Sequence, residues 1–248
     1  MKVVCIVQAR MGSERLPGKV LKPIKGKPMI LYTLNRLSCS KYIDKIILAT
    51  SHKEEELPLV KVCEDAGYEV FRGDEANVLK RYKDAVDAYT DEACTIIRVT
   101  GDCPLIDPVI VDNVVSSFLI NDYDYARLDV PETFIRGFDV EVFSRDALSS
   151  VYEIVKDNES DEYAPYKEHV TLYIYRHPEQ FRIGVVKGTE LYKKPYRLCV
   201  DTAEDLEVVK DILQDFDNDY VNAKNIVHYL DANPDAAFIN IGIKQKQL

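Results

Sequence analysis

The sequence predicts an α/β protein in three layers, with helices on both faces of a mainly parallel sheet. Three observations lead to this fold class. Short apolar runs rich in β-branched residues recur along the chain, and they are too short to be helices. In the first half they alternate with amphipathic helical segments, which is typical of parallel β-α-β units. Polar loops follow two of the predicted strands, where sheets of this kind bind ligands.

The first half of the chain contains the regular alternation. Val3–Val7 is predicted to be a buried strand, and prolines and glycines keep residues 9–27 as a loop. Pro28 suits the first turn of a helix that carries apolar residues at helical spacing. The later elements are a strand at 45–49, a helix at 54–66, a strand at 68–71, a helix at 77–89, a strand at 95–99 and a helix at 108–119.

The second half is less regular. Its predicted elements are strands at 124–128, 139–143, 182–186 and 196–200, and helices at 145–156, 161–176, 202–216 and 221–230. No linker, repeat or low-complexity segment separates the halves. We therefore expect one domain over residues 1–248, with an inserted α+β substructure at about 121–196.

Composition narrows the class of protein. The chain has 248 residues, of which 46% are hydrophobic and 30% charged, and its net charge of −10 argues against nonspecific nucleic-acid binding. No apolar run approaches the roughly 18 residues of a membrane span, and no secretion-signal cleavage region is evident. The six cysteines form no CxxC pair, and most of them are predicted to be buried small hydrophobic residues; Cys103 is the exception because it lies within the motif TGDCPLI. We expect a cytoplasmic protein that does not bind a membrane.

Positive charge is concentrated at the start of the chain. Residues 1–45 contain 10 Lys and Arg but only two acidic residues, a net charge of +8. A local anion site explains this segment, and a solvated basic face is the alternative.

The loop after the first strand has the composition of a polyphosphate site. It contains three cations and two glycines, namely Arg10, Arg15, Lys19, Gly12 and Gly18. Glycines let backbone N–H groups approach phosphate, and three cations offset most of the charge of a triphosphate. A Walker A loop is excluded because Lys19 is followed by Val20, and the dinucleotide motif G-x-G-x-x-G is absent.

Two aspartates follow predicted strands far apart in the chain. Asp102 ends the run RVTGD, and Asp201 ends the run RLCVD. If both strands end at one sheet edge, the carboxylates could share one Mg²⁺, which favours carboxylates alongside substrate phosphates. The alternative is that each is a turn former or a helix cap. Thr202 and Asp205 resemble a capping box, so a structural role is expected for that pair.

Two other features have weaker functional interpretations. Asp122-Tyr123-Asp124 resembles the DxD motif of metal-dependent glycosyltransferases, but acidic turn residues are common at a strand start. His169 could line a pocket or could be an ordinary core or surface histidine.

Three motifs together resemble a known enzyme superfamily. The run QARMGSERLPGK followed by LKPIKGKPMI resembles the signature loop of the cytidylyltransferases that activate acidic sugars, such as the 3-deoxy-manno-octulosonate and acylneuraminate enzymes. TGDCPLI and VDTAEDLE look like their second and third motifs. RGFDVEVFSRDAL and KEHVTLYIYRHPEQF look closest to the spore coat polysaccharide biosynthesis protein F branch.

This resemblance implies a Rossmann-like nucleotidyltransferase fold, similar to nucleotide-diphospho-sugar transferases, with CTP as substrate and Mg²⁺ as cofactor. The product would be a CMP-linked acidic sugar for surface polysaccharide synthesis, with pyrophosphate released by a homodimeric enzyme. Catalytic roles are implied for Arg10, Lys19, Asp102 and Asp201, with Mg²⁺ on the two aspartates. The implied CTP contacts are Gln8, Ala9, Arg10, Gly12, Ser13, Arg15, Lys19, Arg72 and Thr100.

The acceptor is less well defined. We expect residues 121–196 to build its pocket, with Arg136, Asp139 and His169 as candidates. Thr100 stands where the octulosonate enzymes often have Gln, and their acceptor-binding segments are not recognisable here. A phosphonate or phosphosugar acceptor, a glycosyltransferase that uses a nucleotide sugar, and a non-catalytic binding module are the alternatives.

Overall fold

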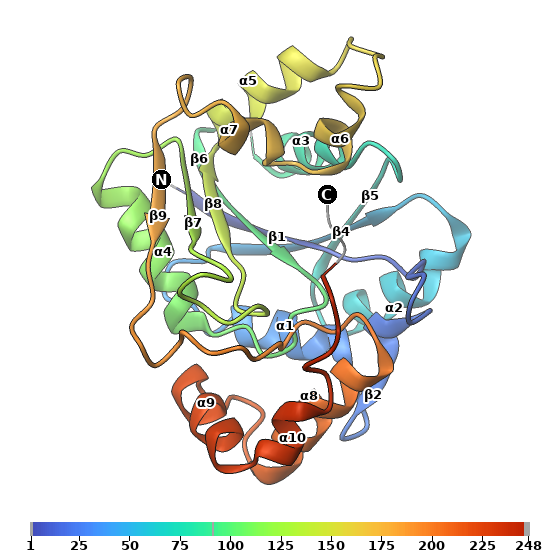
Figure 1. The fold of residues 1–248 in the computed structure, drawn as a ribbon. Helices are drawn as coiled ribbons and strands as arrows, with labels where there is room; N and C mark the ends of the chain where they lie inside the picture. The colour runs from blue at the N-terminus through green and yellow to red at the C-terminus, as the bar shows by residue number, and fades with distance from the viewer. Residues whose placement is uncertain (1, 91, 246–248) are drawn as a thin grey trace.

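A computed structural model describes residues 2–90 and 92–245 of the chain (Figure 1). The strands are β1 (Lys2–Gln8), β2 (Pro23–Ile24), β3 (Lys27–Pro28), β4 (Lys45–Ser51), β5 (Glu69–Gly73), β6 (Cys94–Thr100), β7 (Tyr125–Leu128), β8 (Glu141–Ser144) and β9 (Ile183–Val186). The α-helices are α1 (Met29–Leu37), α2 (Leu57–Asp65), α3 (Val78–Tyr89), α4 (Pro108–Ile120), α5 (Arg145–Val155), α6 (Ala164–Glu168), α7 (Leu172–Arg176), α8 (Ala203–Asp215), α9 (Ala223–Ala232) and α10 (Pro234–Phe238). Two short 3-10 helices are η1 (Lys19–Leu21) and η2 (Glu54–Glu56).

The central sheet has the strand order β5-β4-β1-β6-β8-β7-β9. Strands β5, β4, β1 and β6 are parallel, β8 is antiparallel to both β6 and β7, and β9 is parallel to β7. Figure 1 shows α3, α5, α6 and α7 on one face, and α1, α2, α4 and α8–α10 on the other. The predicted three-layer α/β class with a mainly parallel sheet is confirmed. No described helix is both long and apolar enough to cross a membrane.

The two faces of the sheet build two cores. Along β1, Val3, Cys5 and Val7 pack into one cluster, whereas Val4 and Ile6 pack into the other. Successive strand residues point to opposite faces, so a run that is apolar at every position belongs to a strand covered on both sides. This is why the short run at the start of the chain is an interior strand.

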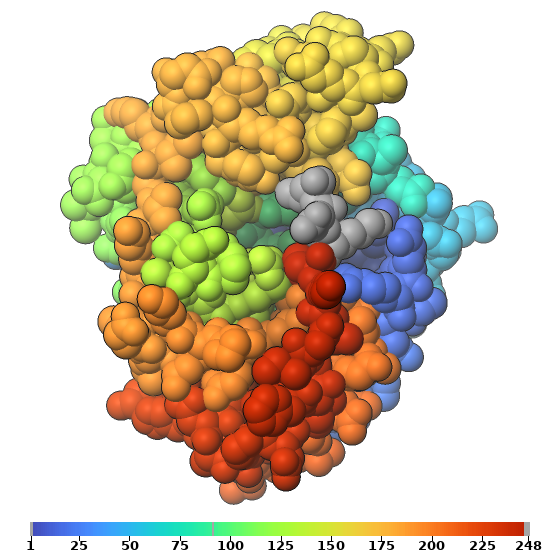
Figure 2. Space-filling view, in the orientation of Figure 1, coloured from blue at the N-terminus to red at the C-terminus, as the bar shows by residue number. Residues whose placement is uncertain are grey.

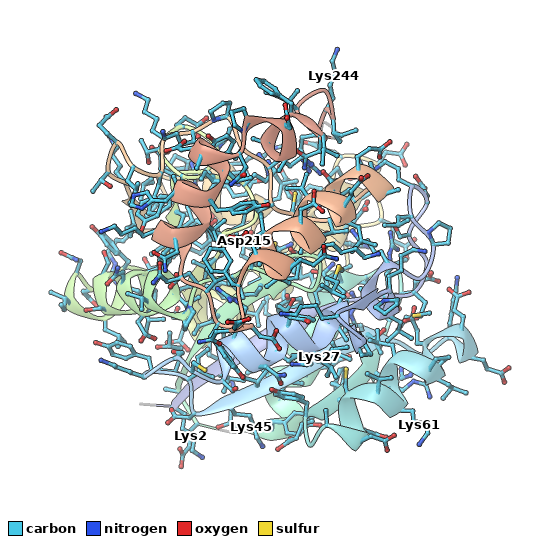
Figure 3. The ribbon with its side chains drawn as sticks, turned by 90° about the horizontal axis from the view of Figure 1, so that it is seen from below. Lys2, Lys27, Lys45, Lys61, Asp215 and Lys244 are labelled. Atoms are coloured by element: carbon cyan, nitrogen blue, oxygen red, sulfur yellow. The ribbon has the colours of Figure 1, made fainter. Side chains whose placement is uncertain are left out.

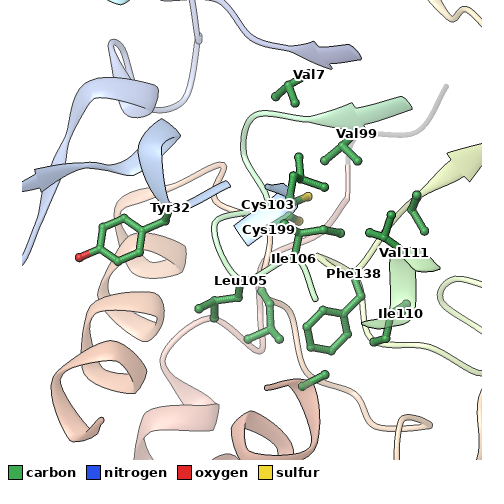
Figure 4. Close-up of a cluster of buried hydrophobic side chains, with 14 of the residues drawn as sticks. Val7, Tyr32, Val99, Cys103, Leu105, Ile106, Ile110, Val111, Phe138 and Cys199 are labelled. Carbon is green, nitrogen blue, oxygen red and sulfur yellow. The ribbon is translucent and has the colours of Figure 1, made fainter. Parts of the chain in front are cut away.

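The core cluster that contains Val3, Cys5 and Val7 extends beneath the loops that follow β1 and β6. Figure 4 shows Cys103 and Cys199 next to each other within this cluster, close to Val99 and Ile106. Burial raises the pKa of both thiols well above the ordinary value. These two cysteines are therefore packing residues, including Cys103, which its place in the motif TGDCPLI had set apart. Cys39, by contrast, is exposed. Seen from below, Lys45, Lys61 and Lys244 point outward at the rim of the molecule (Figure 3).

Several predicted elements differ from the structure. The loop at 9–27 contains η1 and the β2–β3 hairpin, and α10 was not predicted. The helix predicted at 161–176 is split into α6 and α7, because His169 adopts an extended backbone after Glu168.

The strand predicted at 196–200 is wrong. Leu198 N donates to Arg136 O at 2.8 Å, and Val200 N donates to Asp102 O at 2.8 Å. Because the segment bonds to two different loops, no continuous ladder forms, and Arg197 makes only an isolated bridge with Arg136. One domain with an inserted substructure stays a prediction.

Candidate active site

The loops after β1 and β6 are joined where the two strands end. Gln8 and Thr100 are paired in register, and Gly101 N donates to Gln8 O at 2.8 Å. A Cβ at Gly101 would lie 2.7 Å from Ala9 Cβ, so only glycine permits this approach. Gln8 Oε1 is buried without a hydrogen-bond partner in the described part of the chain. This edge of the sheet therefore has an unused hydrogen-bond acceptor, Gln8 Oε1, beside the basic loop.

The basic loop is folded back on itself before η1 begins. Met11 O accepts from Ser13 N at 2.9 Å and from Gly18 N at 3.0 Å. Gly18 has a φ of 65°, a left-handed conformation that glycine adopts without strain. The chain reverses there, and Lys19 enters the interior as the first residue of η1. Gly12 remains exposed and Ser13 half-buried.

Lys19 joins the two predicted aspartates. Its Nζ donates to Asp102 Oδ2 at 2.9 Å, to Asp201 Oδ1 at 2.9 Å and to the carbonyl oxygen of Val200 at 2.7 Å. Burial alone would lower the pKa of Lys19, but the two carboxylates outweigh it and the pKa is raised. One buried cation therefore bridges side chains that are 99 positions apart in the sequence.

Asp201 accepts from two further cations. Arg15 Nη2 lies 2.9 Å from Asp201 Oδ2, and Arg197 Nη2 lies 2.5 Å from the same oxygen. Burial opposes ionisation of Asp201, but Lys19, Arg15 and Arg197 together lower its pKa. The carboxylate is thus held as an anion.

The capping box at the start of α8 fixes the backbone at Asp201. Asp205 Oδ2 accepts from Asp201 N at 2.9 Å and from Thr202 N at 3.0 Å, and Thr202 Oγ1 accepts from Asp205 N at 3.3 Å. The structural roles predicted for Thr202 and Asp205 are confirmed.

The pair Asp102 and Asp201 has the chemistry of a hard-cation site. Both carboxylates contact the Lys19 ammonium, which shows that the two side chains lie together at the same edge of the sheet. Within residues 2–90 and 92–245, no group of three or more His, Cys, Asp or Glu side chains could hold a metal ion. Mg²⁺ is commonly bound by one or two carboxylates together with substrate phosphates, so the two aspartates fit that ion.

The remaining predicted CTP contacts lie in two places. Arg10 is exposed on the basic loop, close enough to Arg81 to contribute to the lowered pKa of that buried residue, after the larger effect of burial. Arg72 lies on β5 and donates to the carbonyl oxygens of Ser51, His52 and Lys53, at 3.4, 2.5 and 3.0 Å. The structure therefore uses Arg72 to hold the loop after β4.

The predicted acceptor residues lie on two different parts of the fold. Arg136 and Asp139 are 3.7 Å apart before β8, and Gly137 N donates to Asp139 Oδ2 at 2.6 Å. Burial raises the pKa of Asp139, and nearby Asp102 adds to this effect. His169 follows α6, where burial lowers its pKa and the cations Arg98 and Arg176 act in the same direction. Figure 2 shows a hollow between the region of α6 and α7 and the segment before β8.

The family comparison covers most of the chain. A family model described as cytidylyltransferase matches residues 4–226. The chain belongs to the cytidylyltransferase family.

The matches to two similar proteins cover almost all of this cytidylyltransferase. Spore coat polysaccharide biosynthesis protein SpsF of Bacillus subtilis (strain 168) is 35% identical over 241 residues, covering 95% of this chain and 96% of that protein. The structure of a cytidylyltransferase from Leptospira borgpetersenii serovar Hardjo-bovis (strain JB197) is 30% identical, with a TM-score of 0.88 and full coverage of both chains.

A more distant solved structure shares the fold. The CMP:2-keto-3-deoxy-manno-octonic acid synthetase complexed with CTP has a TM-score of 0.62 at 18% identity, and the match covers 87% of this chain and 99% of that one.

The DxD-like sequence of the cytidylyltransferase is engaged elsewhere. Arg182 binds Asp122 through Nη1 and Asp124 through Nη2, the second contact at 2.9 Å. The hydrogen bonds from Arg182 lower the pKa of Asp124. Both aspartates thus tie the start of β7 to the start of β9.

Sequence reasoning missed two charged residues that support the site. Glu56 lies in a run of three glutamates, of which it alone is buried, and nothing in the run distinguishes it. Arg197 lies four residues before Asp201, a spacing that could have been read as a contact. Glu56 Oε2 accepts from Met11 N and from Thr50 Oγ1, both at 2.9 Å, and so anchors the basic loop to β4.

We expect Glu56→Ala to loosen the basic loop. The substitution leaves Met11 N and Thr50 Oγ1 without their acceptor, which costs about 2 kcal/mol of unfolding free energy, and we expect the KM for CTP to rise. Urea unfolding and steady-state kinetics measure the two effects. The exposed Glu54→Ala is the control. A Glu56→Ala protein with unchanged stability and unchanged KM would show that the anchor is dispensable.

Proposed function

We propose that this protein transfers CMP from CTP to an acidic sugar and releases pyrophosphate, in the synthesis of a surface polysaccharide or glycoconjugate. The observation that carries the proposal is Lys19, which joins Asp102 and Asp201 directly behind the basic loop. The similar proteins support it, since SpsF is a spore coat polysaccharide biosynthesis protein and the synthetase is complexed with CTP.

The reaction is an in-line displacement at the α-phosphorus of CTP. An acceptor oxygen forms the new bond to that phosphorus, the bond to the oxygen of the β-phosphate breaks, and pyrophosphate leaves while the acceptor proton passes to solvent. Positioning and charge stabilisation supply most of the catalysis in such transfers. Arg10, Arg15 and Lys19 offset negative charge on the triphosphate and on the departing pyrophosphate.

The strand ends serve the nucleotide in this proposal. The backbone of the loop at Ala9, Gly12 and Ser13 lies against the phosphates, and the unused Gln8 Oε1 accepts an N–H group of the nucleotide. Thr100 lies beside Gln8 in register. Asp102 and Asp201 would hold Mg²⁺, which supplies further positive charge at the phosphates.

In this proposal the sugar acceptor occupies the hollow between α6 and α7 on one side and the segment before β8 on the other. Arg136 and Asp139 contact it from the segment before β8, and His169 contacts it from the connection between α6 and α7. The family resemblance also supports a homodimer. The alternative is that the same transfer of CMP from CTP takes place on a phosphonate or phosphosugar acceptor. The engagement of Asp122 and Asp124 by Arg182 counts against a DxD-dependent glycosyltransferase.

A nucleotide and acceptor screen tests this proposal. We expect pyrophosphate release with CTP and an acidic sugar, and little release with ATP, GTP or UTP. The panel contains acidic sugars, phosphosugars and phosphonates, each incubated with Mg²⁺ and followed by a coupled pyrophosphate assay. Omitting the acceptor is the control for CTP hydrolysis. Equal turnover with all four nucleotides would contradict the cytidylyl assignment, and CMP transfer to a phosphonate alone would replace the acceptor class.

A further inference from the structure

The chain beyond α10 returns to the aspartate site. Figure 1 shows the segment after α10 running back from the lower helices towards the sheet edge. Asn240 is 3% exposed, and its Nδ2 donates to Arg197 O at 3.0 Å and to Asp205 Oδ1 at 2.8 Å. Further along, Gln245 Oε1 accepts from Arg197 Nη1 at 2.7 Å. We call residues 239–245 the return segment.

Arg197 uses each nitrogen of its guanidinium for a different partner. Nη2 contacts Asp201, Nε contacts Asp205 at 3.0 Å, and Nη1 contacts Gln245. The side chain of Arg197 is 8% exposed. A planar fork with fixed donors transmits the position of one partner to the others, so the return segment helps to set the direction in which Nη2 meets Asp201.

We propose that Arg197 is a positioning residue for the reaction and that the return segment, through Asn240 and Gln245, holds it on Asp201. This inference rests on the proposed function, in which Asp201 is a ligand of the cation that accompanies CTP.

The origin of the three cations on Asp201 explains why Arg197 matters. Lys19 and Arg15 come from the basic loop, whose charges the proposed reaction directs to the triphosphate. Arg197 belongs to neither the loop nor the sheet edge, and the other two partners of its guanidinium lie in α8 and the return segment. It is therefore the contact that fixes the Asp201 carboxylate when the loop cations turn to the nucleotide. Residues that orient a metal ligand in this way strongly affect affinity and activity.

Gln245→Ala is the informative variant, because Gln245 is exposed and its loss leaves the core intact. We expect the dissociation constant of Mn²⁺ in the presence of CTP, measured by electron paramagnetic resonance, to rise about tenfold. The thermal unfolding midpoint without metal should stay at the wild-type value. The Mg²⁺ concentration needed for half-maximal pyrophosphate release should rise in parallel, and kcat at saturating Mg²⁺ should change less.

Two comparisons separate positioning from general stability. Gln214→Ala makes the same change on the exposed face of α8 and should leave Mn²⁺ binding unchanged. In the Arg197→Lys background, which keeps the charge but loses the fork, Gln245→Ala should have no further effect, because the two residues act through one contact.

Each outcome decides the inference. Wild-type Mn²⁺ affinity in Gln245→Ala, or full additivity of Gln245→Ala with Arg197→Lys, would overturn it. If the wild-type protein itself binds no Mn²⁺ with CTP and releases no pyrophosphate, the proposed function fails, and the inference falls with it. Weakened Mn²⁺ binding in Gln245→Ala with an unchanged unfolding midpoint supports it.

Discussion

Asp102→Asn and Asp201→Asn are each expected to lower pyrophosphate release by about a thousandfold, the upper range for loss of one group that stabilises transition-state charge. Asparagine keeps the size of the side chain and removes the negative charge that we propose binds Mg²⁺. In each variant Lys19 keeps one of its two carboxylate partners and the carbonyl of Val200. Both proteins should therefore fold, and coupled pyrophosphate assays alongside circular dichroism measure the two properties.

Asp65→Asn is the matched control for this pair. Asp65 is exposed and pairs only with Lys61 one helical turn away in the described structure, and surface pairs of this kind contribute little to stability. Its pyrophosphate release should equal that of the wild type. Near-normal pyrophosphate release by either Asp102→Asn or Asp201→Asn would contradict the assignment of the two aspartates as Mg²⁺ ligands. Unfolding of either variant would mean that the aspartates act mainly to neutralise Lys19.

The parts of the site that follow strand ends could be predicted from sequence. An uninterrupted apolar run marks a strand that is buried on both faces, and the carboxyl ends of parallel strands share one edge. Asp102 was therefore expected at the same edge as the basic loop, and the pairing of β1 with β6 places the two loops side by side. Asp201 reaches the same edge by a different route, because the strand predicted before it is absent and Val200 N instead bonds to Asp102 O.

What could not be predicted depends on side-chain direction and on distant contacts. Lys19 was expected to meet the phosphates, but no local pattern indicated that the left-handed Gly18 and the turn of η1 also bring its ammonium between the two aspartates. Asn240 and Gln245 lie more than 40 positions from Arg197 in the chain, and no local pattern connects them. The family resemblance identified residues by motif position, which says nothing about such contacts.

Arg36→Met is expected to have the largest effect on stability. Arg36 is 1% exposed, and within the described residues its guanidinium donates to backbone carbonyls alone. Its acceptors are Ile106 O at 2.7 Å, Leu105 O at 3.3 Å, Asp219 O at 2.8 Å and Val221 O at 2.6 Å. Burial lowers the pKa of Arg36 to about 10, so the group remains charged at neutral pH. It fastens α1 to the segment after Asp102 and to the α8–α9 connection.

Methionine fills much of the same volume but leaves four carbonyl oxygens without a donor. Each buried unsatisfied group costs about 1–3 kcal/mol, and partial relaxation brings the expected loss of unfolding free energy to about 4 kcal/mol. Urea unfolding measures it, with Arg176→Met as the control at an exposed arginine. Arg36→Lys should lose less, because one ammonium still reaches some of the carbonyls. A loss below about 1 kcal/mol for Arg36→Met would show that water replaces the guanidinium. Because Leu105 and Ile106 follow Asp102 within one loop, turnover should fall together with stability.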